Sequence, residues 1–195
     1  MDNVWLVLVI VVGYFLGNIS PSTIIGRING VDIKKEGSGN AGTTNALRVL
    51  GKKAAIITLV VDVLKGVIAV ELGFMVSGNL GGMLCCLAAF AGHCWPILLK
   101  FKGGKGVATA FGGILAVNWQ LALISLAIVA VVVLISRMVS LGAITVSVCF
   151  PVIAYFLDRD FFWIGVIMAL ILLFNHRANF MRIIKGEENK LSFKK

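Results

Sequence analysis

Residues 120–136 read QLALISLAIVAVVVLIS, a run of mostly apolar side chains that carries no charge. A run of this length is close to the roughly 20 apolar residues that a helix needs to cross the hydrocarbon core of a bilayer. The whole chain has this character, because 59% of its 195 residues are hydrophobic and 14% are charged. A soluble domain carries about 25% charged residues. The sequence therefore predicts an all-α integral membrane protein.

Seven apolar segments predict membrane-spanning helices, at residues 4–25, 54–77, 80–100, 107–118, 120–136, 139–157 and 161–175. The fourth is short for a full crossing, which predicts a tilted or broken span. The first does not resemble a signal peptide, because Asp2 stands where positive residues belong and no cleavage site follows. No repeat or linker divides the chain, so we expect one domain over residues 1–195.

The charges predict how the spans are oriented. Lys and Arg concentrate between spans one and two, at the junction of spans three and four, between spans five and six, and in the tail. The alternate segments hold acidic residues and a single basic one, namely Asp2, Glu71, Asp158, Asp160 and Arg159. Because positive residues favour cytoplasmic loops, we expect the N-terminus outside and the C-terminus in the cytoplasm. Four polar segments then share the cytoplasmic side and suggest one site: residues 37–48, 92–109, 136–142 and 175–182.

The first polar segment, GSGNAGTTNALR (37–48), is a candidate phosphate-binding loop. Gly37, Gly39 and Gly42 have the spacing of a dinucleotide loop. That reading fails because the acidic residue that should follow, Asp62, lies inside an apolar span. Glycines nevertheless let consecutive backbone N–H groups converge on an anion. A flexible cytoplasmic turn is the alternative.

A short helix is expected directly after these glycines. Thr43 or Thr44 is a plausible N-cap, and Gly51 closes the helix. Asn45 and Arg48 are three residues apart, so we expect them to share one helix face. The guanidinium of Arg48 can bind a phosphate through two N–H groups.

A second loop, KGGKG (102–106), repeats this chemistry. Its glycines offer backbone donors, its lysines offer positive charge, and a helix begins directly after it at Val107. The loop therefore predicts a second phosphate site. The alternative is a basic loop attracted to anionic lipid headgroups.

The sequence has two histidines, and they differ in context. His176 and Asn179 are three residues apart at the end of the last span, so His176 is a candidate general base and Asn179 a candidate substrate ligand. His93 lies in a turn within an apolar span and suits either function or structure. Asp62 and Lys65 lie inside the second span, where charges are costly, and predict either a functional pair or an ion pair that holds helices together.

No nucleophile motif, metal-ligand spacing or disulfide framework is present. Neither G-x-S-x-G nor Ser-x-x-Lys occurs, and the His-x4-Asp pattern of common lipid acyltransferases is missing at both histidines. The four cysteines lie in apolar segments and are interpreted as small buried side chains.

Four long motifs resemble the bacterial acyl-phosphate-dependent glycerol-3-phosphate acyltransferases, the PlsY family. They are GSGNAGTTNALRVLGKK (37–53), DVLKG (62–66), GHCWP with FKGGKGVAT (92–96 and 101–109) and HRANFMRIIKGEENKL (176–191). The resemblance implies seven transmembrane helices in a bacterial inner membrane, with the active site facing the cytoplasm. It implies acyl transfer from acyl phosphate to the 1-hydroxyl of glycerol 3-phosphate, without metal or cofactor. A soluble enzyme that produces acyl phosphate is an expected transient partner, and no nucleic acid is expected.

The resemblance also implies the residues that perform the reaction. Catalytic roles fall to Ser38, Arg48, Lys105, His176 and Asn179. Substrate contacts are expected from Ser140 and the two loops, that is Gly37, Gly39, Asn40, Gly42, Thr43, Thr44, Asn45, Gly103, Gly104 and Gly106. Asp62, Lys65 and His93 stay open candidates. Thr43 departs from the alanine that is more frequent in the family.

Two other function classes fit parts of the pattern. A transporter of a small phosphorylated solute would use broken helices with glycines near the anion, but its site would lie at the bilayer midplane. A non-catalytic binder of anionic lipids would use the basic loops alone. Such a lipid binder would not need the pair His176 and Asn179 or the spacing of the glycines.

Overall fold

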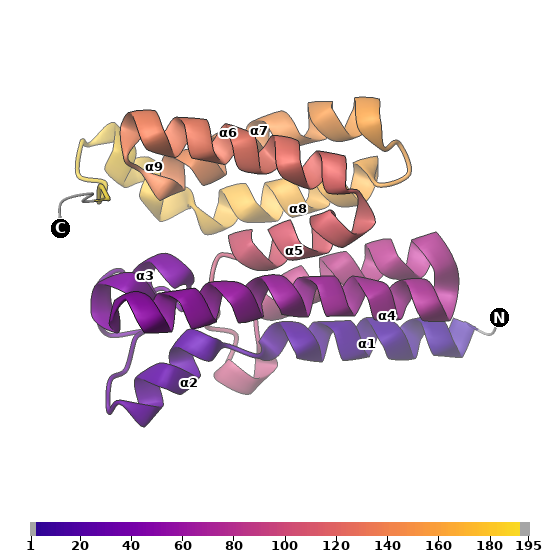
Figure 1. Cartoon of the computed structure of the whole chain (residues 1–195), viewed down its shortest axis with the longest axis horizontal. Coiled ribbons are helices and arrows are strands. Elements are labelled where there is room, and N and C mark those ends of the chain that lie inside the picture. The colour runs from indigo at the N-terminus through magenta and orange to yellow at the C-terminus, as the bar shows by residue number, and fades with distance from the viewer. Residues whose placement is uncertain (1–2, 192–195) are drawn as a thin grey trace. The chain divides into compact units, whose positions relative to one another are not determined.

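The computed structural model describes residues 3–191. Every regular element in that range is helical, which confirms the all-α prediction (Figure 1). The chain forms two compact units, Met1–Val117 and Asn118–Lys195. This division into compact units does not test the expectation of one domain, which stays a prediction. Asp2, Lys194 and Lys195, which entered the charge count, lie outside the described residues.

The first unit is built around one long helix and the loops at its ends. Its elements are α1 (Asn3–Asn18), α2 (Pro21–Ile28), α3 (Thr43–Val49), α4 (Gly51–Cys94), the short 3₁₀ turn η1 (Ile97–Leu99) and α5 (Val107–Val117). The predicted first span is broken, because α1 ends at Asn18 and Pro21 begins α2. Proline is well suited to the first position of a helix, since the N–H group that it lacks has no partner there.

Helix α4 is a hairpin of two arms. Its backbone leaves helical geometry at Ser77 and Gly78, where Gly78 has a φ of 59°. A side chain on Gly73 would clash with the backbone of Gly81, so the arms meet backbone to backbone. The arms, 51–76 and 79–94, cover the second and third predicted spans, and α1 and α5 pack on them. The core between α1 and the arms contains small side chains such as Ala69, Cys85 and Ala89.

The second unit is a helical bundle. It contains α6 (Trp119–Ser136), α7 (Val139–Leu157), α8 (Phe162–Asn175) and α9 (Arg177–Ile184). Asn118 caps α6, because its Oδ1 accepts hydrogen bonds from the backbone N–H groups of Gln120 and Leu121. Helix α7 packs against α6, α8 and α9. The axis bends by 55° between α8 and α9, at His176.

Between residues 3 and 191, three helical stretches are long and apolar enough to cross a membrane: Asn3–Ile28, Trp119–Ser136 and Val139–Leu157. Helices α8 and α9 make a fourth if the bent pair counts as one span. Helix α5 is apolar but shorter, as the sequence predicted. The full set of seven spans stays a prediction.

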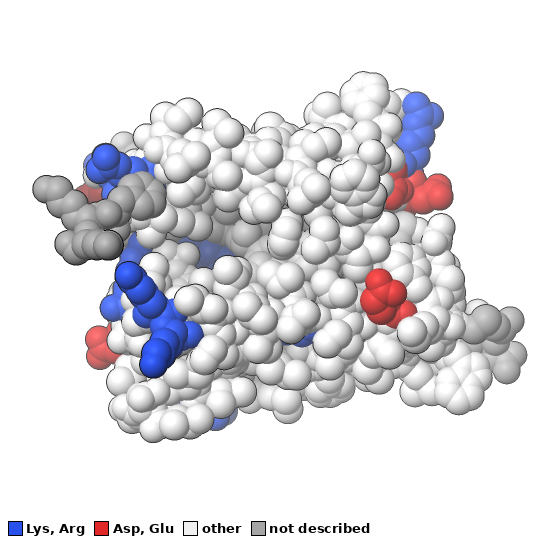
Figure 2. Space-filling view, in the orientation of Figure 1, with Lys and Arg blue, Asp and Glu red and all other residues white. Residues whose placement is uncertain are grey.

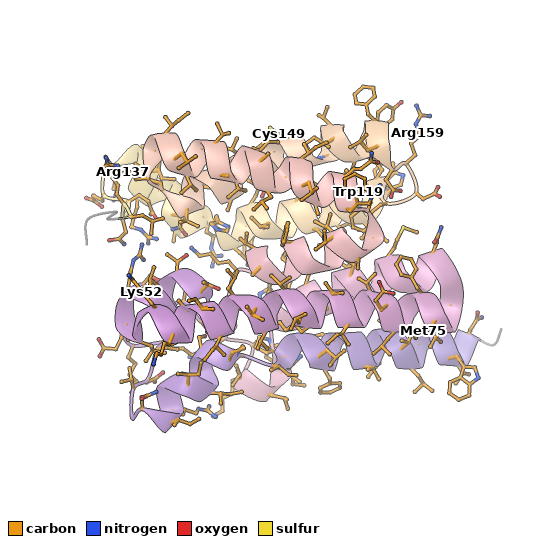
Figure 3. The ribbon with its side chains drawn as sticks, viewed as in Figure 1. Lys52, Met75, Trp119, Arg137, Cys149 and Arg159 are labelled. Carbon is orange, nitrogen blue, oxygen red and sulfur yellow. The ribbon has the colours of Figure 1, made fainter. Side chains whose placement is uncertain are left out.

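Basic residues gather at one end of the first unit. Figure 2 shows Lys and Arg side chains concentrated where α2, α3 and the start of α4 lie. In Figure 3, Lys52 and Met75 mark opposite ends of the first arm of α4. In the second unit, Arg137 and Arg159 likewise lie at opposite ends. In each unit, the labelled residue nearer the predicted cytoplasmic side therefore lies at the opposite end from the one nearer the predicted outer side.

Candidate functional site

The first glycine loop is held by the side chain of Asn45, which is buried to 1% exposure. Its Oδ1 accepts a hydrogen bond from the backbone N–H of Ser38 at 2.9 Å. Its Nδ2 donates to the carbonyl oxygens of Ile33 and Glu36, at 3.1 Å each. A side chain on Gly37 would clash with Asn45 Oδ1, and Gly37 has a φ of 60°, so this position requires glycine. Asn45 therefore fixes the path of the loop from the inside.

This arrangement corrects two expectations about the loop. The N-cap of α3 is Gly42, not Thr43 or Thr44, and Thr43 is the first residue of the helix. Asn45 and Arg48 do not share an environment, because Asn45 is buried whereas Arg48 is exposed. The reason is that the loop folds back over one face of α3, covers Asn45 and leaves Arg48 at the surface.

Two backbone N–H groups of the first loop are bonded within the protein. The N–H of Ser38 is bonded to Asn45, and the N–H of Gly39 donates to the carbonyl of Glu36 at 3.0 Å. These two N–H groups are therefore engaged within the protein, and the expectation that the loop binds an anion stays a prediction. The exposed side chain of Ser38 adds a hydroxyl group to the loop.

The second glycine loop lies against the end of α4. The backbone N–H of Gly104 donates to the carbonyl oxygen of His93 at 3.1 Å. A side chain on Gly104 would clash with His93 Nε2, and one on Gly103 would clash with the carbonyl of His93. Helix α5 begins at Val107, as predicted. Glycine lets this loop follow α4 closely, and half-buried Lys105 lies in it.

Behind this loop, Asp62, Lys65 and His93 form a buried polar cluster. Lys65 Nζ lies 2.7 Å from Asp62 Oδ1 and 2.8 Å from His93 Nδ1. It also donates to the carbonyl oxygens of Gly17 and Ile19, at 3.0 and 2.6 Å. These carbonyls lie at the end of α1, where helices leave acceptors unsatisfied. The cluster thus ties α1, both arms of α4 and the second loop together, which favours the structural alternative for all three residues.

In the second unit, the carboxylate of Glu188 accepts hydrogen bonds from three polar side chains. Its Oε1 accepts hydrogen bonds from Ser140 Oγ at 2.9 Å and Asn179 Nδ2 at 2.8 Å. Its Oε2 accepts one from Arg182 Nε at 2.9 Å. Burial alone would raise the pKa of Glu188, but the bonds from Asn179, Ser140 and Arg182 outweigh it and hold that pKa below its usual value of 4.5. Glu188 is therefore an anion at neutral pH.

His176 lies at the bend between α8 and α9 and is 3% exposed. Its Nδ1 lies 2.9 Å from the carbonyl oxygen of Leu172. Because a carbonyl only accepts, Nδ1 carries the proton in this bond. In the neutral imidazole Nε2 then holds the lone pair, which is the arrangement that a general base requires.

Comparison with known proteins identifies the family of the chain. The sequence model of the glycerol-3-phosphate acyltransferases matches residues 7–186. The chain belongs to the glycerol-3-phosphate acyltransferase family. The acyltransferase of Clostridioides difficile (strain 630) is 44% identical over 97% of both chains, and that of Finegoldia magna is 41% identical over 98% of both.

Two solved structures share the fold of this acyltransferase. They are the glycerol 3-phosphate form and the lysophosphatidic acid form of PlsY (YgiH), an integral membrane glycerol 3-phosphate acyltransferase. They superpose with TM-scores of 0.91 and 0.88, at 31% identity over 96% of this chain and 96% and 95% of theirs. The chain is thus a multi-pass integral membrane acyltransferase of phospholipid synthesis, which confirms the family resemblance.

The acyltransferase brings its predicted residues together in two sets, one in each unit. The first unit holds the two glycine loops, with Ser38, Arg48 and Lys105. The second unit holds Ser140 and Asn179 on the common partner Glu188. Asn40, Gly42 and Thr44 are half-buried in the first loop and its helix, and Gly106 is buried in the second.

Glu188 is the residue of the acyltransferase that sequence reasoning missed. Its motif, GEENKL, was noted only as part of the family pattern. The signal was Gly186, which follows α9 with a φ of 72° and turns the chain back. The backbone N–H of Leu191 then donates to the carbonyl of Arg137 at 2.7 Å, which fixes the returning segment. A glutamate in a segment that turns back toward α9 is a candidate hydrogen-bond partner for Asn179.

Proposed function

We propose that the chain transfers a fatty acyl group from acyl phosphate to the 1-hydroxyl of glycerol 3-phosphate. The hydroxyl oxygen bonds to the acyl carbon, and the bond from that carbon to the phosphate oxygen breaks. Inorganic phosphate leaves with the electron pair, and lysophosphatidic acid is the other product. The observation that carries the proposal is the match of 96% of the chain to PlsY in a glycerol 3-phosphate form and a lysophosphatidic acid form.

The first unit has the chemistry to hold acyl phosphate. Ser38 offers a hydroxyl group from a loop that Asn45 keeps in place, and Lys105 offers a positive charge from a loop packed on His93. Acyl phosphate is already activated, so a protein nucleophile is unnecessary. We assign to Ser38 and Lys105 the binding of the phosphate and the stabilisation of the charge that it gains on leaving.

We assign glycerol 3-phosphate to Arg48, His176 and Asn179. Exposed Arg48 can bind the phosphate of this substrate through two N–H groups. His176 directs Nδ1–H to the carbonyl oxygen of Leu172, so Nε2 is the ring nitrogen that we assign as the base for the substrate hydroxyl. A phosphate oxygen of the substrate is the alternative base. The bond from Asn179 to Glu188 sets the orientation of the amide.

The test is phosphate release by purified protein in detergent, with acyl phosphate and labelled glycerol 3-phosphate. Loss of one charge-stabilising donor costs roughly 10²–10³-fold in turnover, so Lys105→Ala should fall by that order. Lys53→Ala, an exposed lysine of α4 with no assigned role, is the matched control. Unchanged turnover in Lys105→Ala would remove the charge-stabilising role. Near-normal turnover of His176→Gln with a flat pH profile would leave the substrate phosphate as the base.

We also propose seven spans, with the basic ends of both units and the active site in the cytoplasm. The segregation of charge within each unit supports this orientation. Single-cysteine variants on a background without native cysteines test it with a membrane-impermeant maleimide on intact cells. Met75→Cys, 80% exposed near the α4 hairpin, should be labelled from outside, and exposed Lys52→Cys only after lysis. Labelling in the reverse order contradicts the orientation.

A further inference from the structure

A second polar feature of the first unit lies outside the residues assigned to the substrates. A cavity of about 510 Å³ opens between α2 with the loop after it and the turn at η1. Its volume is within the roughly 300–1,000 Å³ of small-molecule sites. None of its lining residues has a role in the proposed reaction.

Hydrogen bonds fix both walls of the cavity. On one side, Gly30 follows α2 with a φ of 70°, and the N–H of Val31 donates to the carbonyl of Gly26 at 2.8 Å, the hydrogen bond of a Schellman motif. On the other side, Tyr14 and Asn18 of α1 hold the η1 turn. Tyr14 donates to the carbonyl of Trp95 at 2.7 Å, and Asn18 accepts from the N–H of Leu98 at 3.3 Å. The cavity is therefore part of the folded structure.

The lining of the cavity is strongly basic. It contains four cations, Arg27, Lys34, Lys100 and Lys102, and one carboxylate, Asp32. Asp32 Oδ1 accepts a hydrogen bond from the backbone N–H of Lys34 at 3.1 Å. Between residues 3 and 191, none of the four cations forms an ion pair. Partial burial, together with Arg27 and Lys102, lowers the pKa of Lys34 despite Asp32, so the positive charges are crowded. An anion would relieve this repulsion.

Exposed apolar residues adjoin the basic lining of the cavity in sequence. Leu98, itself a lining residue, is 69% exposed. Ile28 follows Arg27 and is 79% exposed, and Phe101 stands between Lys100 and Lys102 and is 59% exposed. Basic side chains beside exposed apolar ones are the pattern of protein segments that lie in the interface of a membrane. We propose that this cavity binds the phosphate group of an anionic lipid, whose acyl chains lie against these exposed apolar residues. Such a lipid would hold α2 and the η1 turn together at the membrane surface, independently of the acyl transfer.

The test measures phosphatidic acid retained by the full-length protein, in neutral detergent, by native mass spectrometry. Phosphatidic acid is suitable because both of its acyl positions are occupied, so it is not the proposed product. In Arg27→Gln/Lys34→Gln two cations are lost, and at about 1 kcal/mol per cation the apparent affinity should fall by about 30-fold. Lys52→Gln/Lys53→Gln removes the same charge from the exposed start of α4 and should change the affinity by less than about threefold.

Further variants and competing ligands decide the outcome. Lys100→Gln/Lys102→Gln removes charge from the opposite wall and should also weaken binding. If one double variant fails to fold, the other still tests the proposal. Equal retention of zwitterionic phosphatidylcholine, or an equal loss in the Lys52/Lys53 pair, would overturn the proposal. So would an equal loss in Arg48→Ala, because the lipid would then occupy the substrate site. Displacement by millimolar inorganic phosphate would show that the cavity takes free phosphate in place of a lipid headgroup.

Discussion

The carboxylate of Glu188 offers the sharpest test of the second unit. In Glu188→Gln, the amide oxygen can still accept from Ser140 and Asn179, but the amide nitrogen then faces Arg182 Nε, a donor against a donor. Bonds to a charged acceptor contribute about 1.5–3 kcal/mol each and neutral ones about 1 kcal/mol. We discount the Arg182 pair, because that side chain is 35% exposed and solvent screens it. The expected loss is about 2–3 kcal/mol in the free energy of unfolding, chiefly from weaker bonds to Ser140 and Asn179.

For a chain of this length, that loss lowers the melting temperature by about 4–12 °C. The measurement is thermal unfolding in detergent, followed by tryptophan fluorescence. Glu187→Gln is the matched control, because Glu187 is the neighbouring residue and is exposed. Equal melting temperatures for the two variants would refute the reasoning.

The same carboxylate predicts a dependence on pH. The pKa of Glu188 is lower in the folded protein than its usual value of 4.5. Its stabilisation is therefore fully present above that usual value and is lost as pH falls through the lowered pKa. The melting temperature of the wild type should fall more steeply below pH 4.5 than that of Glu188→Gln. Parallel curves would contradict the assignment.

Three further predictions concern the first unit. Asn45→Ala removes three hydrogen bonds of the first loop, so kcat/KM should fall by at least about tenfold, or 1.4 kcal/mol, in a phosphate-release assay. In Gly104→Ala, the new methyl group clashes with His93 of the buried cluster, so KM for the phosphate substrate should rise and the melting temperature should fall. Lys65→Met leaves the carboxylate of Asp62 buried without its cation, and the melting temperature should fall by at least about 6 °C. Asp62→Leu combined with Lys65→Met should recover part of that loss.

The sequence by itself predicted where most helices and both glycine loops lie, and which side chains are candidates for the reaction. Runs of apolar residues placed α5 to α8 within one or two residues of their observed ends, because a helix in a membrane needs an uninterrupted apolar stretch. Glycine-rich segments between those runs predicted both loops, because glycine adopts the backbone conformations that tight turns require. Ser38, Arg48, Lys105, His176 and Asn179 followed from motif and residue type. The break of the first span before Pro21 and the hairpin at Gly78 also have local signals in the sequence.

Only the tertiary structure decided which of these side chains contact one another. Helical spacing put Asn45 and Arg48 on one face, but the loop covers only Asn45, and burial depends on what packs above a residue. Asp62, Lys65 and His93 were ambiguous in sequence, since a buried charge is costly with or without a function. Their distances to each other and to the end of α1 favour the structural role. Glu188 meets Ser140 because a chain reversal at Gly186 brings distant segments together, and periodicity within one helix carries no information about that contact.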